Sequence, residues 1–224
     1  MSKSQEISGA MIWTIIGQIF NFPNSFIKMK RFCDIILSVF VLIVLAPLFM
    51  ITVVIIMIES GGGFIYTQKR VGKENKDFNL YKFRTMKVDS DKKGLLTVGM
   101  RDARITRFGY FLRKYKLDEF PQLINIIRGD MSIVGPRPEV RRYVELYDEN
   151  QQKVLTVRPG LTDYASLEYF HENKILAHVK NPEKAYIEEI MPHKIALNLA
   201  YLEKQSLKED FSIILRTFRN IVLS

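Results

Sequence analysis

The stretch that decides the fold is residues 35–58, IILSVFVLIVLAPLFMITVVIIMI, which carries no charged side chain. The run is too long for a β-strand, and about 20 apolar residues suffice to cross a bilayer as a helix. A buried core helix would need other elements to cover every face. We therefore expect a helix that associates with a membrane.

Pro47 stands near the middle of this run. Proline removes a backbone donor and clashes with the preceding turn, so the helix should kink there. Basic residues flank the run on both sides: Lys28, Lys30 and Arg31 before it, Lys69, Arg70 and Lys73 after it. Because basic flanks prefer the cytoplasmic side, two topologies are open: a single bent transmembrane helix, or a re-entrant helix that enters and leaves on one face.

The net charge of +9 over 224 residues points to a polyanionic partner, such as anionic lipid, a phosphorylated substrate or nucleic acid. We find no RNA- or DNA-binding motif, and aromatic residues do not interleave with the basic ones as a stacking platform would, so nucleic acid is not an expected partner. Cys33 is the single cysteine, which excludes an intramolecular disulfide. The three histidines lack the spacing of a metal site.

The chain before and after the apolar run predicts several shorter elements. Residues 1–27 indicate an interfacial segment with a short helix at 11–20. Residues 64–71 and 77–83 carry strand-like side chains around a polar turn, which predicts a β-hairpin.

Helices are expected next at residues 103–115 and 120–128, the second closed by Gly129. Pro182 starts a further helix, and Pro192 breaks or restarts it.

The last helix should follow Ser206, which forms a capping box with Glu209. Its amphipathic pattern fits packing on the core or lying on the membrane.

Asp118 and Glu119 come just before the helix at 120–128. Helix N-termini favour anions, so a carboxylate there should stay ionised and could act as a nucleophile toward phosphorus. The alternative is that Asp118 only caps the helix. Basic residues surround the pair in the sequence and could hold a pyrophosphate: Arg104, Arg107, Arg113, Lys114, Lys116, Arg128 and Arg137.

Several motifs occur in a characteristic order along the chain: KRFCD at 30–34, QKRVG at 68–72, YKFRTM at 81–86, LDEFPQL at 117–123 with Asn125, GDMSIVGPRP at 129–138 and RPGLT at 158–162. In these motifs the chain resembles the bacterial sugar transferases that are small monotopic phosphoglycosyl transferases. The resemblance is close over residues 28–165 and loose beyond them.

The resemblance implies a ping-pong reaction in which Asp118 attacks the sugar-bearing phosphate of a UDP-sugar. UMP leaves, and polyprenyl phosphate, with undecaprenyl phosphate as the expected carrier, then takes the phosphosugar. The resemblance also implies Mg²⁺ as cofactor, with Asp118 and Glu119 as ligands. Glu119 could instead accept a proton from the incoming group. Further substrate-binding residues are expected within the matched motifs, at Lys82, Arg84, Gln122, Arg137 and Arg158, and before the acidic pair, at Arg113.

The same resemblance favours the re-entrant topology, with Pro47 as the membrane break, although Ala46 stands where relatives often have serine. The expected fold is α+β and helix-dominated: an N-terminal segment (1–27), a re-entrant membrane helix (28–60) and a cytoplasmic catalytic domain (61–224) with the β-hairpin and amphipathic interfacial helices. The active site should lie on the cytoplasmic face of the inner membrane. Residues 163–167, DYASL, depart from the pattern of many relatives after RPGLT, so the sugar stays open, as does a homodimer.

Two other functions are open at this point. A non-catalytic scaffold could bind anionic lipid through its basic face; it needs no acidic pair and predicts binding that weakens steeply with salt. Water could also replace the lipid as the acceptor.

Overall fold

The computed structural model describes residues 23–88 and 104–223, and the helix expected at 11–20 lies outside them. The described chain is dominated by helices, with two small sheets. The elements in order are α2 (Asn24–Ser60), β1 (Ile65–Val71), η1 (Lys73–Asn75), β2 (Asp77–Phe83), α3 (Arg107–Lys114), η3 (Leu117–Glu119), α4 (Gln122–Arg128), β3 (Ser132–Val134), α5 (Arg141–Val144), η4 (Gln151–Thr156), β4 (Gly160–Thr162), α6 (Tyr164–Glu168), α7 (Glu172–Ala177), α8 (Pro182–Ala185), the π-helical η5 (Tyr186–Ile190), α9 (Met191–Lys204) and α10 (Leu207–Val222).

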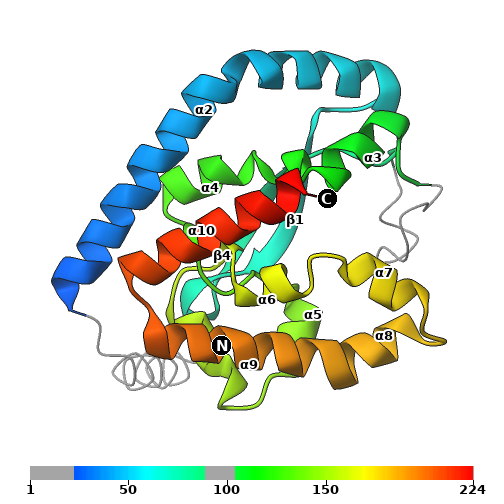
Figure 1. Ribbon diagram of the computed structural model, residues 1–224. Coiled ribbons are helices and arrows are strands. Elements are labelled where there is room, and N and C mark those ends of the chain that lie inside the picture. Colours follow the sequence, from blue (N-terminus) through cyan, green and yellow to red (C-terminus); the bar gives the residue numbers. More distant parts are fainter. Residues whose placement is uncertain (1–22, 89–103, 224) are drawn as a thin grey trace, which may run out of the picture.

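The apolar run forms the middle of α2, a helix of 37 residues that continues through Pro47. Figure 1 shows α2 bending into two arms that pass over α4 and α3. The helix is long and apolar enough to cross a membrane, and only 11% of its most apolar window is buried. Most of its apolar side chains therefore face outward, as a membrane helix requires, and the predicted kink is confirmed.

Asp34 fixes the first arm of α2 to the domain. Its carboxylate accepts hydrogen bonds from the Ser132 hydroxyl at 2.8 Å and the Ile133 amide at 3.1 Å, both on β3. The second arm packs Ile56 with Phe83 and Leu112, on β2 and α3. The membrane-type helix and the polar domain are thus one packed unit.

The predicted hairpin is confirmed. β1 and β2 pair antiparallel, with Ile65 opposite Phe83 and Val71 opposite Asp77. Asn125 of α4 is fully buried behind the hairpin, where its side chain accepts from the Tyr81 amide at 3.0 Å and donates to the Asn79 carbonyl at 2.8 Å. One buried amide therefore sets the position of α4 against β2.

The helix expected at 103–115 is shorter than predicted. α3 begins at Arg107 because the Thr106 hydroxyl accepts from the Gly109 amide at 2.9 Å and caps it. Ile105 instead pairs with Met86 in an isolated β-bridge.

The helix expected at 120–128 begins at Gln122 and ends at Gly129, whose φ of 98° is the left-handed conformation that glycine adopts easily. A separate 3₁₀ turn, η3, carries Asp118 and Glu119 just before it. Pro121 occupies the N-cap of α4, so Asp118 does not cap this helix.

A parallel pair, β3 with β4, was not expected from the sequence. Ser132 lies opposite Gly160 and Val134 opposite Thr162. The two strands approach so closely that a Cβ on Gly160 would lie 2.2 Å from backbone atoms of Gly135. Only glycine fits at this crossing.

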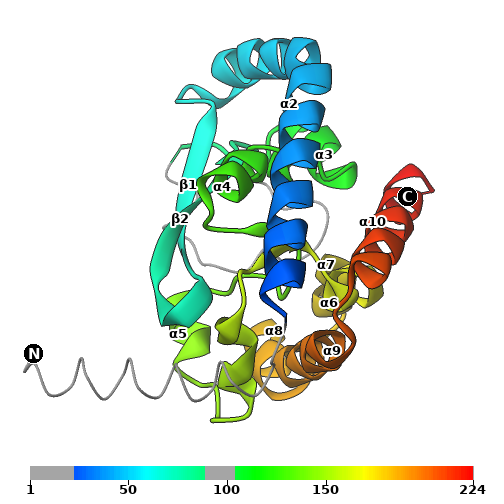
Figure 2. The ribbon, with the colours of Figure 1, turned by 90° about the vertical axis from the view of Figure 1, so that its left-hand side faces the viewer.

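In the C-terminal third, α8 begins at Pro182 as predicted, and Pro192 lies in the first turn of α9, where the α-helix restarts after the π-helical η5. Ser206 caps α10 by accepting from the Glu209 amide at 3.2 Å. The Glu209 carboxylate accepts from the Tyr164 hydroxyl at 2.5 Å, so α10 is tied to α6. Figure 2 shows α9 and α10 on one side of the molecule and the hairpin on the other.

Candidate active site

The η3 turn places both acidic side chains inside the protein. Asp118 is 7% exposed and Glu119 is 8% exposed. The turn follows Lys116, which has a positive φ of 56°. Buried carboxyl groups need partners or they lose their charge, and the two residues differ in the partners they find.

Glu119 is held as a carboxylate by two cations from distant segments. Its Oε1 accepts a hydrogen bond from the Arg137 guanidinium and lies 3.4 Å from Lys82 Nζ on β2. Burial alone would raise the pKa of Glu119, but the charges of Arg137, Lys82 and Lys116 outweigh it and hold this pKa well below its usual range. The charge of Glu119 in turn raises the pKa of Arg137.

Asp118 has the opposite balance. Burial raises its pKa, and the neighbouring negative charge of Glu119 raises it further. The positive charges of Lys82, Arg113 and Lys116 oppose this rise without cancelling it. The sequence predicted that Asp118 stays ionised at a helix N-terminus. Asp118 lies in η3 instead, and its pKa is raised, because burial and Glu119 disfavour the charged form more than the nearby cations favour it.

Lys82 contributes the third buried charge of the cluster. The pKa of Lys82 is lowered, because the effect of burial outweighs the opposing effect of the negative charges of Glu119 and Asp118. An ammonium in this position can balance either carboxylate or a phosphate group.

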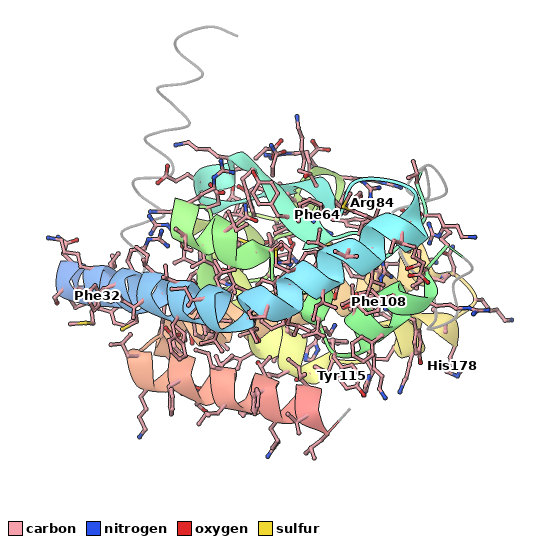
Figure 3. All side chains as sticks on the ribbon, turned by 90° about the horizontal axis from the view of Figure 1, so that it is seen from above. Phe32, Phe64, Arg84, Phe108, Tyr115 and His178 are labelled. Carbon is pink, nitrogen blue, oxygen red and sulfur yellow. The ribbon has the colours of Figure 1, made fainter. Side chains whose placement is uncertain are left out.

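Arg84 and Arg113 lie on the wall of the same cavity. Arg84 Nε donates to the Gly63 carbonyl at 2.6 Å, and Figure 3 shows Arg84 beside Phe64 where the hairpin begins and ends. Arg113 Nε donates to the Thr85 hydroxyl at 2.8 Å. Their side chains are thus oriented by the protein before any ligand binds.

Gln122 and Arg158 are not among the residues that line the cavity. Gln122 is 1% exposed in the first turn of α4, and Arg158 Nε donates to the Gly129 carbonyl at 2.8 Å, at the far end of that helix. Their roles in substrate binding stay predictions.

The cavity has a volume of about 1050 Å³ and an uneven lining. Asp118, Glu119, Lys82 and Arg137 form its charged end. An apolar end lies between α2 and α10, and a third wall comes from α6, α7 and α9. The space is large enough for a nucleotide sugar, since ligand pockets commonly measure about 300–1,000 Å³.

Asp163 positions Arg137 and was missed by the sequence analysis. It is fully buried, its Oδ2 accepts from the Arg137 amide at 3.1 Å and its Oδ1 accepts from the Ser166 amide at 2.6 Å. The signal available was an Asp three residues before a Ser at a helix start, a capping pattern that says nothing about Arg137.

Two polar atoms on the α6–α9 wall make no hydrogen bond within the part of the chain that the structure describes: Ser166 Oγ and Asn198 Oδ1. Both are buried, and an unpaired buried polar group costs about 1–3 kcal/mol. Hydroxyl or amide groups of a bound ligand can satisfy them.

A magnesium ion is compatible with the donor set at the charged end. Mg²⁺ usually takes one or two carboxylates together with substrate phosphate oxygens, and Asp118 and Glu119 supply two. Across residues 23–88 and 104–223, no group of three or more His, Cys, Asp or Glu side chains forms a metal site. Mg²⁺ held by these two carboxylates would take its further ligands from substrate phosphates and water.

Comparison with known proteins gives consistent matches. A family model described as "Bacterial sugar transferase" matches residues 25–224. The chain is 41% identical over 165 residues to the putative undecaprenyl-phosphate N-acetylgalactosaminyl 1-phosphate transferase of Bacillus subtilis (strain 168), covering 71% of this chain and 88% of the relative.

Two longer relatives match as well. Identity is 35% over 196 residues to the UDP-N-acetylgalactosamine-undecaprenyl-phosphate N-acetylgalactosaminephosphotransferase of Aeromonas hydrophila, covering 86% of this chain and 43% of the relative. Identity is 30% over 219 residues to the UDP-glucose:undecaprenyl-phosphate glucose-1-phosphate transferase of Escherichia coli (strain K12), covering 96% of this chain and 44% of the relative. The chain thus spans less than half the length of these two proteins.

Proposed function

The chain belongs to the bacterial sugar transferase family and is a phosphoglycosyl transferase, and we propose that it transfers a sugar-1-phosphate from a UDP-sugar to undecaprenyl phosphate through a covalent intermediate on Asp118. The relatives named above support the substrate classes. The observation that supports the mechanism is the buried acidic pair: Glu119 is ion-paired with Lys82 and Arg137, whereas Asp118 has no ion pair within residues 23–88 and 104–223.

In the first step, a carboxylate oxygen of Asp118 attacks the phosphorus that bears the sugar. The bond from this phosphorus to the bridging oxygen breaks, and UMP leaves with that oxygen and its electron pair. A phosphosugar then remains on Asp118 as an acyl phosphate.

In the second step, an oxygen of the lipid phosphate attacks the same phosphorus and expels the Asp118 carboxylate. The product is a polyprenyl diphosphate sugar, and the enzyme returns to its starting state. We expect Lys82, Arg113 and Arg137, which line the same cavity, to balance the phosphate charge in both steps.

Glu119 is a positioning residue in this scheme. A carboxylate whose pKa is held low by Arg137 and Lys82 is a weak base, so we favour orientation of these cations over the proton-acceptor role. With phosphates bound, Asp118 and Glu119 would hold Mg²⁺, which neutralises pyrophosphate charge.

The membrane helix fits a reaction with one soluble and one lipid substrate. We propose that α2 is re-entrant, with the bend at Pro47 inside the bilayer and the active site on the cytoplasmic face of the inner membrane. The basic residues on both flanks of α2 support this topology, because they favour the cytoplasmic side.

The scaffold alternative requires only a basic surface. It gives no reason to bury an acidic pair against Arg137 and Lys82, and burial of charges is costly unless they serve a purpose. The arrangement therefore favours the enzyme.

The test is Asp118→Asn in the full chain, purified and reconstituted in membranes. We expect UMP release from UDP-sugars with undecaprenyl phosphate to fall at least about a thousandfold, because an amide cannot form the intermediate. Asp148→Asn, on an exposed loop, is the matched control and should keep the wild-type rate. The panel should include UDP-N-acetylgalactosamine and UDP-glucose, since relatives named for both sugars match. Wild-type turnover by Asp118→Asn would contradict the mechanism.

A further inference from the structure

The apolar end of the cavity is a groove between two helices that come from opposite ends of the chain. Leu37 and Val41 of α2 form one wall, and Ile214, Phe218 and Ile221 of α10 form the other. Ile133 on β3 and Leu161 on β4 line the space between them.

The two helices are tied at one end and part toward the other. Lys30 near the start of α2 forms an ion pair with Asp210 in the first turn of α10, and both side chains are largely buried. Tyr201 also donates to this Asp210, at 2.6 Å. Figure 2 shows α2 and α10 side by side at this end and farther apart toward the C-terminus of α10. The groove is therefore V-shaped, with a fixed vertex.

The floor of the groove is held in place by β4. The Thr162 and Thr217 hydroxyls are hydrogen-bonded at 2.7 Å, which joins β4 to the middle of α10. Thr162 is followed by Asp163, which positions Arg137. The apolar groove thus continues directly into the charged end of the same cavity.

The walls of the groove are continuous with the outward apolar faces of both helices. On α2, Ile36 and Phe40 are 55% and 61% exposed, and on α10 Phe211 and Val222 are each 62% exposed. If these faces contact the hydrocarbon of a bilayer, the groove opens into it. A chain lying in the groove would pass from the bilayer to the charged cluster without crossing water.

We propose that this groove binds the isoprenoid chain of the lipid substrate, with the lipid phosphate at Arg137. The inference rests on the proposed function, because that function requires a phosphate with a long apolar tail. The groove offers apolar walls where the tail would lie and cations where the phosphate would lie. The remaining isoprene units would extend into the bilayer.

The test compares adjacent residues of the same helix, of which one lines the groove and the next is exposed on the outer face. Leu37→Trp and Ile221→Trp put an indole into the groove, whereas Ile36→Trp and Val222→Trp put it on the outer faces. Leu37 is 39% exposed, so the larger side chain should be accommodated without disturbing the core. The readout is the ratio of kcat/KM for undecaprenyl phosphate to kcat/KM for geranyl phosphate, measured at saturating UDP-sugar with each full-length protein.

We expect the ratio to fall about tenfold in the two groove variants, because a few buried methylenes are lost for the long chain only. The two outer-face variants should keep the wild-type ratio. A general loss of folded protein lowers both rates together and leaves the ratio unchanged.

An unchanged ratio in both groove variants, or an equal fall in the outer-face variants, would overturn the proposal and leave the groove to ordinary bilayer lipid. The proposed function fails separately: it falls if the wild-type protein forms no lipid-linked phosphosugar with any UDP-sugar in the panel.

Discussion

The two ends of the cavity are built in different ways. At the charged end, Lys82, Glu119 and Arg137 come from three separate segments and meet at one carboxylate oxygen. At the apolar end, the faces of α2 and α10 stand apart and are joined at Lys30 and Asp210. Under the proposed function, reactivity would depend on a few short contacts, whereas lipid access would depend on how two helices are spaced.

The parallel pair β3–β4 connects the two ends. Ile133 and Leu161 line the apolar groove, and Pro136 and Arg137, which follow β3 after Gly135, line the charged end. A substitution in this strand pair should affect both ends of the cavity. A substitution elsewhere should affect one end and leave the other unchanged.

The largest effect is expected for Gly160→Ala. A Cβ here would lie 2.2 Å from the nitrogen and oxygen of Gly135, so the strands must part. Overpacking of a well-packed site typically costs about 1–3 kcal/mol, and backbone contacts this short should reach the upper end. Thermal unfolding in detergent should show a clear fall in Tm, together with loss of both UMP release and lipid-chain discrimination. Gly63→Ala is the control, since nothing lies within 4 Å of a Cβ there, and a Gly160→Ala protein as stable as this control would refute the close-packed joint.

Glu119→Gln should disrupt the ion pairs at the charged end of the cavity and leave the groove unchanged. The amide leaves Arg137 and Lys82 without their shared negative charge, so both cations should turn toward other partners. Groups that act through positioning commonly cost about a hundredfold in kcat/KM when removed. The long-chain to short-chain ratio should stay at the wild-type value, because the groove is untouched. Glu203→Gln, exposed on α9, is the control, and a fall in that ratio for Glu119→Gln would show that the two ends are not separable.

Lys82→Met should shift the dependence of kcat/KM on pH. Protonated Asp118 is not a nucleophile, so kcat/KM should fall about tenfold per pH unit below the pKa of Asp118. The charge of Lys82 lowers this pKa, and its removal should therefore raise the pKa and move the acid limb to higher pH. Lys69→Met, exposed on β1, should leave the limb in place. An acid limb that stays where it is, or moves to lower pH, would remove Asp118 as the titrating group.

Much of the apolar end could be predicted from sequence because its signals are local. The uncharged run with Pro47 indicated a bent membrane helix, and Ser206 with the pattern after it indicated α10. The joint between the ends could not be predicted, since β3 and β4 are three residues each and buried nearly throughout, with no alternation to read. The close approach of Gly135 and Gly160 is a contact between residues 25 positions apart in the printed sequence.

The charged end was predicted in its members but not in its electrostatics. The acidic pair and Arg137 stood out as residue types, and the structure brings them together with Lys82. Whether a carboxyl group is buried depends on the fold, so the opposite pKa shifts of Asp118 and Glu119 were not readable from their adjacent positions. Asp163 was missed because its capping pattern did not reveal its bond to the Arg137 amide.

The smallest effect is expected at the third wall, for Asn198→Ala. Asn198 Oδ1 is buried on the cavity wall without a partner in residues 23–88 and 104–223. If a UDP-sugar group donates to it, the loss of one hydrogen bond should raise the KM for that UDP-sugar about three- to tenfold, matching roughly 0.5–1.5 kcal/mol. The KM for undecaprenyl phosphate should not change, because Asn198 is not one of the residues that form the groove between α2 and α10. Asn220→Ala on α10 is the control. An effect confined to the lipid KM would place the lipid tail on the α6–α9 wall and contradict its assignment to the groove.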